Sequence, residues 1–266
     1  MAYETILYEK TGQVAKITFN LPDRRNVMTS ALLREFHEAV LDIKKSAGLR
    51  ALVITGSGKA FCAGADLSAL TELVQGSGLT GVAGTREGIR GMYDAFLESL
   101  QLDIPTIAAV NGYAIGGGLG LALCCDIRIA ADSAKFAANF ATIGIHPGMA
   151  ITYMLPRLIG RGRACDLLFT GRMVEAQEAE RIGLVEKVVP LAELQAEAQA
   201  MADTIALSAP YVVKLAKKAV YKGLDFHPDM SIESEATAQA LCAQMGDATE
   251  GIKAFFEKRK PQFKGE

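Results

Sequence analysis

The sequence is poor in the residue types that bind metal ions or form disulfide networks. Its three histidines, His37, His146 and His227, are scattered along the chain without metal-ligand spacing. The five cysteines include no C-x-x-C pair, and their odd number argues against a complete disulfide framework. We therefore predict no metal site, and we expect reduced, buried thiols in a cytoplasmic protein.

An excess of charge of one sign is also lacking. The 28 basic and 30 acidic residues give a formal net charge of -2, which provides no reason to expect a nucleic-acid partner. The first ten residues carry charges and lack the apolar run of a signal peptide. Residues 104–125 are uncharged and long enough to cross a bilayer, but Pro105 and the Asn111-Gly112 turn favour a strand, a loop and a buried helix instead. We predict no membrane partner.

The common sequence motifs for nucleotide binding and for a hydrolase nucleophile are missing too. The GSGK stretch at 56–59 fails the P-loop pattern, because Val53 replaces its first glycine and Ala60 its Ser/Thr. Gly116 and Gly118 fail the dinucleotide pattern, because Leu121 stands where a third glycine is required. The hydrolase motif G-x-S-x-G does not occur.

What the sequence does contain favours an α/β fold. Half of the 266 residues are hydrophobic, enough for one large domain or a core domain with an appendage. Two short runs around Thr11-Gly12 predict an antiparallel hairpin. Apolar strands and helices then alternate: we predict strands over 51–56, 106–110 and 126–131, a helix beginning at Thr29 or Ser30, a short helix from about Asp66, and a helix over 87–100. The glycine-rich segment 74–84 predicts a mobile surface loop, a candidate lid.

Helices dominate the C-terminal part. We predict them over residues 191–206, 210–223, 231–243 and 247–259. The last three have broader apolar faces than one subunit needs. This indicates packing on a neighbouring copy in a homo-oligomer.

Two glycine-containing turns follow predicted strands and precede helices. Gly116, Gly117, Gly118 and Gly120 form the first, and residues 62–66 (CAGAD) the second. The first N–H groups of a helix have no internal acceptor, and glycine lets a ligand oxygen approach them closely. Two such turns at the carboxyl ends of parallel strands could hold one oxygen as an oxyanion hole. Tight strand–helix packing explains either turn alone equally well.

These turns belong to a longer pattern: PDRRNVM (22–28), ITGSGKAFCAGADL (54–67), the stretches 104–131, 147–164 and 167–189, and FFEKRKPQF (255–263). The sequence resembles the enoyl-CoA hydratase/isomerase family, the crotonase superfamily, over nearly its whole length. The resemblance implies a crotonase-like α/β core of spiralling ββα repeats over 1–200. It also implies a helical C-terminal trimerisation region over 201–266, and a trimer or a hexamer of two trimers.

The resemblance also implies site residues. Ala65 and Gly117 match the two peptide donors that hold a thioester oxygen, and Ala63, Asp66 and Leu67 match the lining of a coenzyme A channel. The basic residues Arg24 and Arg25 match positions facing coenzyme A phosphates, and Phe255 and Lys258 match the C-terminal pair that reaches coenzyme A from a neighbouring subunit. Coenzyme A is then part of the substrate, with no tightly bound cofactor.

The sequence departs from the family where hydratases carry two glutamates. Gly120 and Phe140 occupy these positions, and Gly148 occupies the position that supplies an aspartate in other branches. None of the three can move a proton. His146 is the first candidate for a replacement base, with Glu87, Tyr93 and Asp94 as further candidates. Each also has a structural explanation: a turn for His146-Pro147, and solvent exposure for the carboxylates. Phe140 is expected to form an apolar wall facing the acyl group, and Cys62 to be buried packing.

The resulting hypothesis is an acyl-CoA-processing enzyme of the enoyl-CoA hydratase type. An acyl-CoA decarboxylase, a thioester hydrolase and a non-catalytic acyl-CoA binder remain as alternatives. Decarboxylation needs an enolate to be stabilised but no substrate proton to be abstracted first. The missing glutamates are compatible with it.

Overall fold

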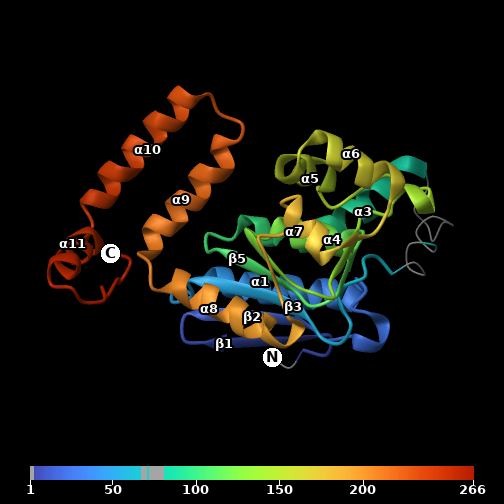
Figure 1. Cartoon of the computed structure of the whole chain (residues 1–266), viewed down its shortest axis with the longest axis horizontal. Coiled ribbons are helices and arrows are strands. Elements are labelled where there is room, and N and C mark those ends of the chain that lie inside the picture. The colour runs from blue at the N-terminus through green and yellow to red at the C-terminus, as the bar shows by residue number, and fades with distance from the viewer. Residues whose placement is uncertain (1–2, 67–70, 72–80) are drawn as a thin grey trace.

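The computed structural model describes residues 3–66, 71 and 81–266 (Figure 1). Six strands form one sheet in the order β1-β2-β3-β5-β7-β10, and all neighbours are parallel except the β1–β2 hairpin. These strands are β1 (Ile6–Thr11), β2 (Val14–Phe19), β3 (Ala51–Gly56), β5 (Thr106–Val110), β7 (Ile127–Ala131) and β10 (Lys187–Val189). The predicted hairpin and strands are confirmed.

A second sheet contains strands that we did not predict individually. Its order is β4 (Ala60–Cys62), β6 (Tyr113–Ile115), β8 (Lys135–Ala137) and β9 (Val174–Glu175). Strands of the two sheets alternate along the chain: β3 is followed by β4, β5 by β6 and β7 by β8. Helix α4 (Gly117–Cys124) follows β6, which completes a ββα unit. This ββα unit, formed by β5, β6 and α4, is the predicted repeat.

The core lies between the six-stranded sheet and the helices on its faces. Every residue of β3 and β5 is buried. Helix α1 (Ser30–Lys45) is capped by Thr29, whose hydroxyl oxygen accepts from the Leu32 N–H at 3.1 Å. Its Phe36 ring stacks on Phe96 with centroids 5.0 Å apart.

The helix predicted over 87–100 begins earlier than expected. Helix α3 covers Gly81–Leu97, so residues 81–84, predicted as loop, are helical, and a 3-10 turn follows at Glu98–Gln101. Phe96, on the inner face of α3, is fully buried. Residues 81–83 at the start of α3 are exposed, so the earlier beginning of the helix is not explained by burial of those residues. The rest of the predicted lid and the helix expected after Asp66 lie outside the described residues.

The remaining helices surround the sheets. They are α5 (Ile151–Ile159), α6 (Arg161–Thr170), α7 (Ala176–Arg181) and α8 (Leu194–Ala206), with 3-10 turns at Pro22–Arg24, Ala141–Ile143 and Leu191–Glu193. Helix α8 packs on β3 and β5 and buries Leu194, Ala198 and Ala202. The predicted boundary between the α/β core and the helical C-terminal region, at residue 200, thus falls within α8, a helix that covers the sheet. Of the helices in the described ranges, none is long and apolar enough to cross a membrane.

Three further helices form an arm that extends away from the sheets (Figure 1). They are α9 (Pro210–Gly223), α10 (Pro228–Ala243) and α11 (Gly246–Phe256), and we call residues 210–266 the C-terminal arm. The limits predicted for α9 were correct. The prediction for α10 began three residues late, and that for α11 ran three residues too far.

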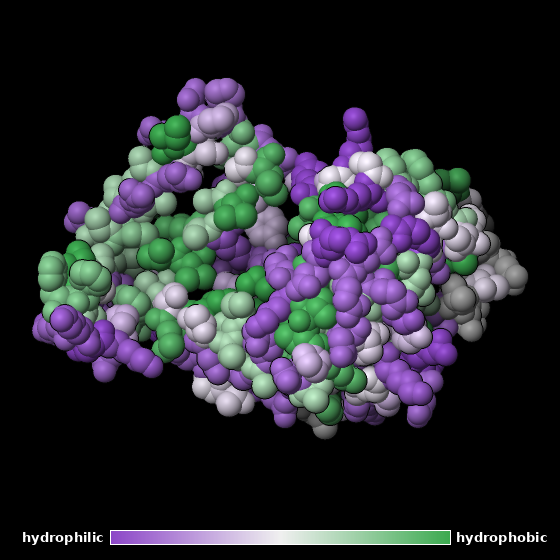
Figure 2. Space-filling model, in the orientation of Figure 1, coloured by the Kyte–Doolittle hydropathy of each residue, from purple (hydrophilic) through white to green (hydrophobic). Residues whose placement is uncertain are grey.

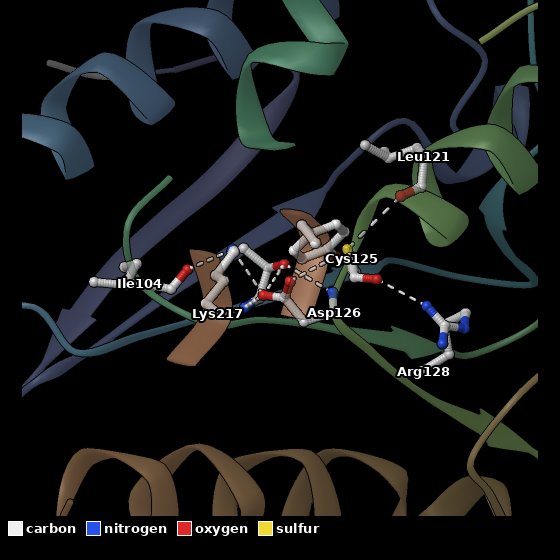
Figure 3. A network of polar contacts seen from close by, with 8 residues as sticks. Ile104, Leu121, Cys125, Asp126, Arg128 and Lys217 are labelled. Carbon is white, nitrogen blue, oxygen red and sulfur yellow. Dashed lines mark hydrogen bonds and ion pairs between the residues drawn. The ribbon is translucent and has the colours of Figure 1, made fainter. Parts of the chain in front are cut away.

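A partly buried polar cluster joins the arm to the sheets (Figure 3). One carboxylate oxygen of Asp126 accepts from Lys217 Nζ at 2.8 Å and from the Thr106 N–H at 2.7 Å. The other accepts from the Tyr221 hydroxyl at 2.8 Å, while Lys217 also donates to the Ile104 carbonyl at 2.9 Å. Burial and the neighbouring Asp126 raise the pKa of Tyr221, so its hydroxyl stays protonated and acts as donor. Helix α9 is therefore anchored by charge-assisted hydrogen bonds.

The cysteines only partly follow the expectation of buried thiols. Cys62, Cys124 and Cys125 are buried, whereas Cys165 and Cys242 are half-exposed. Their positions in the fold explain the difference in burial. The first three lie in or beside the sheets, and the other two lie on peripheral helices α6 and α10.

Candidate active site

The first glycine turn connects β6 to the buried helix α4. Gly116 has φ of +53°, and its N–H donates to the Ala137 carbonyl at 2.8 Å. Helix α4 begins at Gly117, and the Gly120 N–H closes its first turn onto the Gly116 carbonyl at 3.1 Å. Within the described part of the chain, the Gly117 N–H donates to no acceptor. It is the kind of helix-start donor that the sequence predicted.

The second turn, at residues 62–66, is bound to the loop before α1. The Ala63 N–H donates to the Arg25 carbonyl at 3.0 Å, and the Met28 N–H donates to the Gly64 carbonyl at 2.8 Å. Met28 and Ala65 form an isolated parallel bridge. In such a bridge Met28 bonds to the residues on either side of Ala65, which leaves the Ala65 peptide out of the ladder. Its N–H has no acceptor among the residues described here.

The two turns are in direct contact. A Cβ atom added to Gly64 would lie 3.3 Å from the Gly117 nitrogen and 2.7 Å from the Ile115 carbonyl oxygen. A Cβ added to Gly118 would lie 1.9 Å from the Cys62 carbonyl oxygen. Only glycine permits this approach. The contact places the Ala65 and Gly117 peptides in adjacent turns, while their sharing one ligand oxygen stays a prediction.

The loop before α1 is fixed by a buried asparagine. Asn26 accepts from the Leu21 N–H at 2.8 Å and donates to the Ala60 carbonyl at 2.7 Å. Nearby, Arg24 forms an ion pair with Asp66 at 2.6 Å, which joins two predicted coenzyme A contacts to each other. Arg24 and Arg25 are exposed. They therefore add basic charge beside the turn at 62–66.

The positions that lack carboxylates are closely packed. A Cβ on Gly120 would lie 2.5 Å from the Met149 Cβ, so the room for a side chain there is taken by Met149. Phe140 is 8% exposed, and its ring tip lies 3.8 Å from a Cβ built on Gly116. Its aromatic ring thus borders the glycine turn, where an apolar wall was expected.

The third position brings in a side chain that the sequence could not place. A Cβ on Gly148 would lie 1.9 Å from the hydroxyl oxygen of Tyr93, which comes from helix α3. Burial raises the pKa of Tyr93, and the nearby Met149 N–H offsets part of that rise. Tyr93 was one of four candidates, and only the fold reveals its contact with residue 148.

The other acid/base candidates are exposed. The His146 Nδ1 atom lies 2.7 Å from the Pro147 carbonyl oxygen, to which it can donate a hydrogen bond. Glu87 is exposed, and Asp94 pairs with Arg90 at 2.8 Å on the surface of α3. Over the described residues, no contact links these side chains to the glycine turns. A catalytic role for His146 stays a prediction.

The remaining residues predicted to contact coenzyme A lie away from the two turns or outside the described residues. Phe255 is 79% exposed near the end of α11, and Lys258 follows that helix with φ of +53°. Both are on the C-terminal arm, and Leu67 is outside the described residues. Burial raises the pKa of the Cys62 thiol to about 12, which leaves it protonated and supports a packing role. Within the described residues, no group of three or more His, Cys, Asp or Glu side chains is arranged to hold a metal ion.

Comparison with known proteins identifies the family. The sequence matches the enoyl-CoA hydratase/isomerase family over residues 9–266. The chain belongs to this family.

Related proteins share both sequence and fold with this member of the family. The crotonyl-CoA hydratase of Syntrophomonas wolfei is 40% identical over 99% of each chain, and the short-chain-enoyl-CoA hydratase of Clostridium acetobutylicum is 39% identical over 98% of this chain and 97% of its own. The enoyl-CoA hydratase structure from Bacillus anthracis has a TM-score of 0.92 at 39% identity, covering 99% of this chain and all of that one. The crotonase-like fold is thereby confirmed, and the protein is an enzyme of the hydratase/isomerase type.

Proposed function

We propose that this enzyme hydrates an enoyl-CoA thioester whose carbonyl oxygen accepts hydrogen bonds from the Ala65 and Gly117 N–H groups. The observation that carries the proposal is the direct contact of the two turns, since a Cβ on Gly64 would lie 3.3 Å from the Gly117 nitrogen. Both N–H groups lack an acceptor among the residues that the structure describes. The names of the Clostridium and Syntrophomonas relatives support the same reaction class.

The two donors would act on the charge that develops during reaction. When a water oxygen bonds to the β-carbon, the electrons of the double bond move toward the thioester oxygen as an enolate. Fixed N–H donors stabilise that charge without reorganising, and one such donor contributes about 3–4 kcal/mol to the transition state. The N-terminus of α4 adds a favourable dipole at the same point.

Coenzyme A would lie across the loop and the turn that precede this site. We assign Arg24 and Arg25 to its phosphates because both are exposed beside the turn at 62–66. Ala63 and Asp66 would line its path. The Asp66 carboxylate would hold the Arg24 guanidinium, since the two already form an ion pair.

The C-terminal arm would complete the site from a neighbouring copy. Between α9 and α10 lies a groove of about 500 Å³, lined largely by apolar side chains of both helices. We propose that a second copy covers it in a homo-trimer or hexamer, and that Phe255 and Lys258 reach the neighbour's coenzyme A. Buried thiols at Cys62, Cys124 and Cys125 fit a reducing compartment such as the cytoplasm.

A panel of thioesters tests the reaction. Hydration predicts loss of enoyl absorbance with crotonyl-CoA and accumulation of the 3-hydroxyacyl product. Release of CO₂ from a malonyl-type thioester without hydration would replace this proposal by decarboxylation, and release of free coenzyme A would replace it by hydrolysis. Binding of acyl-CoA without turnover across chain lengths would contradict a catalytic role.

A further inference from the structure

The hydroxyl of Tyr93 occupies the place where a side chain at residue 148 would begin. A Cβ on Gly148 would lie 1.9 Å from the Tyr93 oxygen and 2.8 Å from its ring carbon Cζ. The Tyr93 ring packs against the hydrophobic core, so helix α3 fixes the direction in which the hydroxyl points. Glycine at 148 is therefore required for this approach.

The residue after Gly148 contacts the start of α4. Met149 follows Gly148 and is 3% exposed, and its side chain covers the helix start. Its Cγ atom lies 3.6 Å from a Cβ built on Gly117, and its Cβ lies 2.5 Å from one built on Gly120. Tyr93 and the glycine turn therefore both contact the 148–149 segment, Tyr93 at Gly148 and the turn at Met149.

The Tyr93 proton is available to a ligand. The hydroxyl donates to no acceptor among the described side chains and carbonyls, and Tyr93 is half-buried at the edge of an open hollow lined by one face of α3. The two carboxylates on the same helix, Glu87 and Asp94, are instead on the surface. Asp94 is paired with Arg90 on the surface, and Glu87 is exposed.

We propose that Tyr93 is a catalytic residue that carries a proton between the attacking water and the α-carbon of the bound thioester. This role rests on the proposed hydration. The water oxygen bonds to the β-carbon, and the double-bond electrons form the enolate held by Ala65 and Gly117. The Tyr93 O–H bond breaks as its proton goes to the α-carbon, and the proton released by the water returns to the Tyr93 oxygen. The net change is the addition of one water, with Tyr93 restored.

Burial favours the form of Tyr93 that can donate. Desolvation penalises the phenolate and raises the pKa of the hydroxyl above its ordinary value of 10. The group is therefore a neutral donor near pH 7. The Ala65 and Gly117 donors stabilise the enolate until it takes the Tyr93 proton, and the proton released by the added water then neutralises the phenolate.

The test compares Tyr93→Phe with Tyr8→Phe in the full-length protein. Tyr93→Phe keeps the ring and removes the hydroxyl. Tyr8→Phe removes an exposed hydroxyl of the β1–β2 hairpin that donates to Asp42 of helix α1. We expect kcat for crotonyl-CoA to fall about 10²–10⁴-fold in Tyr93→Phe. KM should stay within about a factor of two of the value for the unaltered protein, and the melting temperature within a few degrees. Tyr8→Phe should keep the full rate.

A pH–rate profile gives a second readout. The unaltered enzyme should lose activity at alkaline pH as Tyr93 deprotonates, and the residual rate of Tyr93→Phe should lack that limb. Hydration by Tyr93→Phe at the rate of the unaltered enzyme would overturn the role of Tyr93 and leave the hydratase proposal standing. Failure of the unaltered enzyme to hydrate any enoyl thioester would overturn both.

Discussion

The sheets and the C-terminal arm bury their apolar residues in opposite ways. Every residue of β3 and β5 is buried within one chain, whereas α9 and α10 contain no buried residue. Large apolar side chains of the arm are exposed instead, including Val220 at 66% and Ile232 at 62%, and green patches mark this surface in Figure 2. The sheets therefore form a self-sufficient core, and the arm depends on polar anchors and on the copy that we propose to cover it.

The largest expected effect comes from separating the two glycine turns in the core. Gly118→Ala would place a Cβ 1.9 Å from the Cys62 carbonyl oxygen, which must move and take the Ala65 peptide with it. We expect kcat/KM for enoyl thioesters to fall at least about 10²–10³-fold, the loss typical of one displaced oxyanion donor. Steady-state kinetics and circular dichroism check this.

Gly162→Ala is the matched control, because a Cβ there meets no atom within 4 Å. It lies within α6, so alanine should leave the rate unchanged and stabilise the protein by about 0.5–1 kcal/mol. Equal rates for the two variants would show that the contact between the turns is unimportant for catalysis.

The next effect comes from the joint between arm and core. Asp126→Ala would leave the Lys217 ammonium, whose side chain is only 10% exposed, without a carboxylate partner. We expect the free energy of unfolding to fall by about 3–5 kcal/mol. Urea denaturation followed by circular dichroism measures it. Asp103→Ala is the control, since Asp103 also pairs with lysines of α9 but in solvent, where a pair contributes about 0–1 kcal/mol. Similar losses in both variants would contradict the anchoring role of Asp126.

A smaller, pH-dependent effect is expected at the N-terminal edge of the core. Burial alone would raise the pKa of Glu35, but hydrogen bonds from Thr5 and the Glu4 N–H outweigh it and lower the pKa. Glu35 thus contributes stability above its ordinary pKa of 4.5, and loses it as pH falls through the lowered value. Glu35→Gln should destabilise the protein by about 1.5–3 kcal/mol at pH 7 and much less near pH 3.

Thermal unfolding at both pH values, with Glu38→Gln on the same helix as control, measures this difference. A constant destabilisation from pH 7 to pH 3 would show that Glu35 acts through packing rather than charge.

Sequence reasoning found the parts of the fold that have local signals. Thr29, the apolar strands and Pro210 predicted their elements because caps, periodicity and proline act over a few residues. The three-residue strands β4, β6 and β8 carry no such signal, and helix α3 began earlier than its glycines indicated.

The candidate site shows the same division. Glycines indicated the two turns, because backbone freedom is visible in sequence, and the family resemblance indicated Ala65 and Gly117 within them. The approach of Tyr93 to Gly148 was not visible, since it depends on how α3 crosses a loop 55 residues later. Sequence could name Tyr93 as a candidate, and only tertiary structure separates it from Glu87 and Asp94.

A structure of the enzyme bound to an acyl-CoA tests the central claim most directly. The account predicts that the thioester oxygen lies about 2.7–3.2 Å from both the Ala65 and the Gly117 nitrogens, with the acyl chain passing between Phe140 and Tyr93. A thioester oxygen bound by other groups, or more than hydrogen-bond distance from either nitrogen, would contradict it.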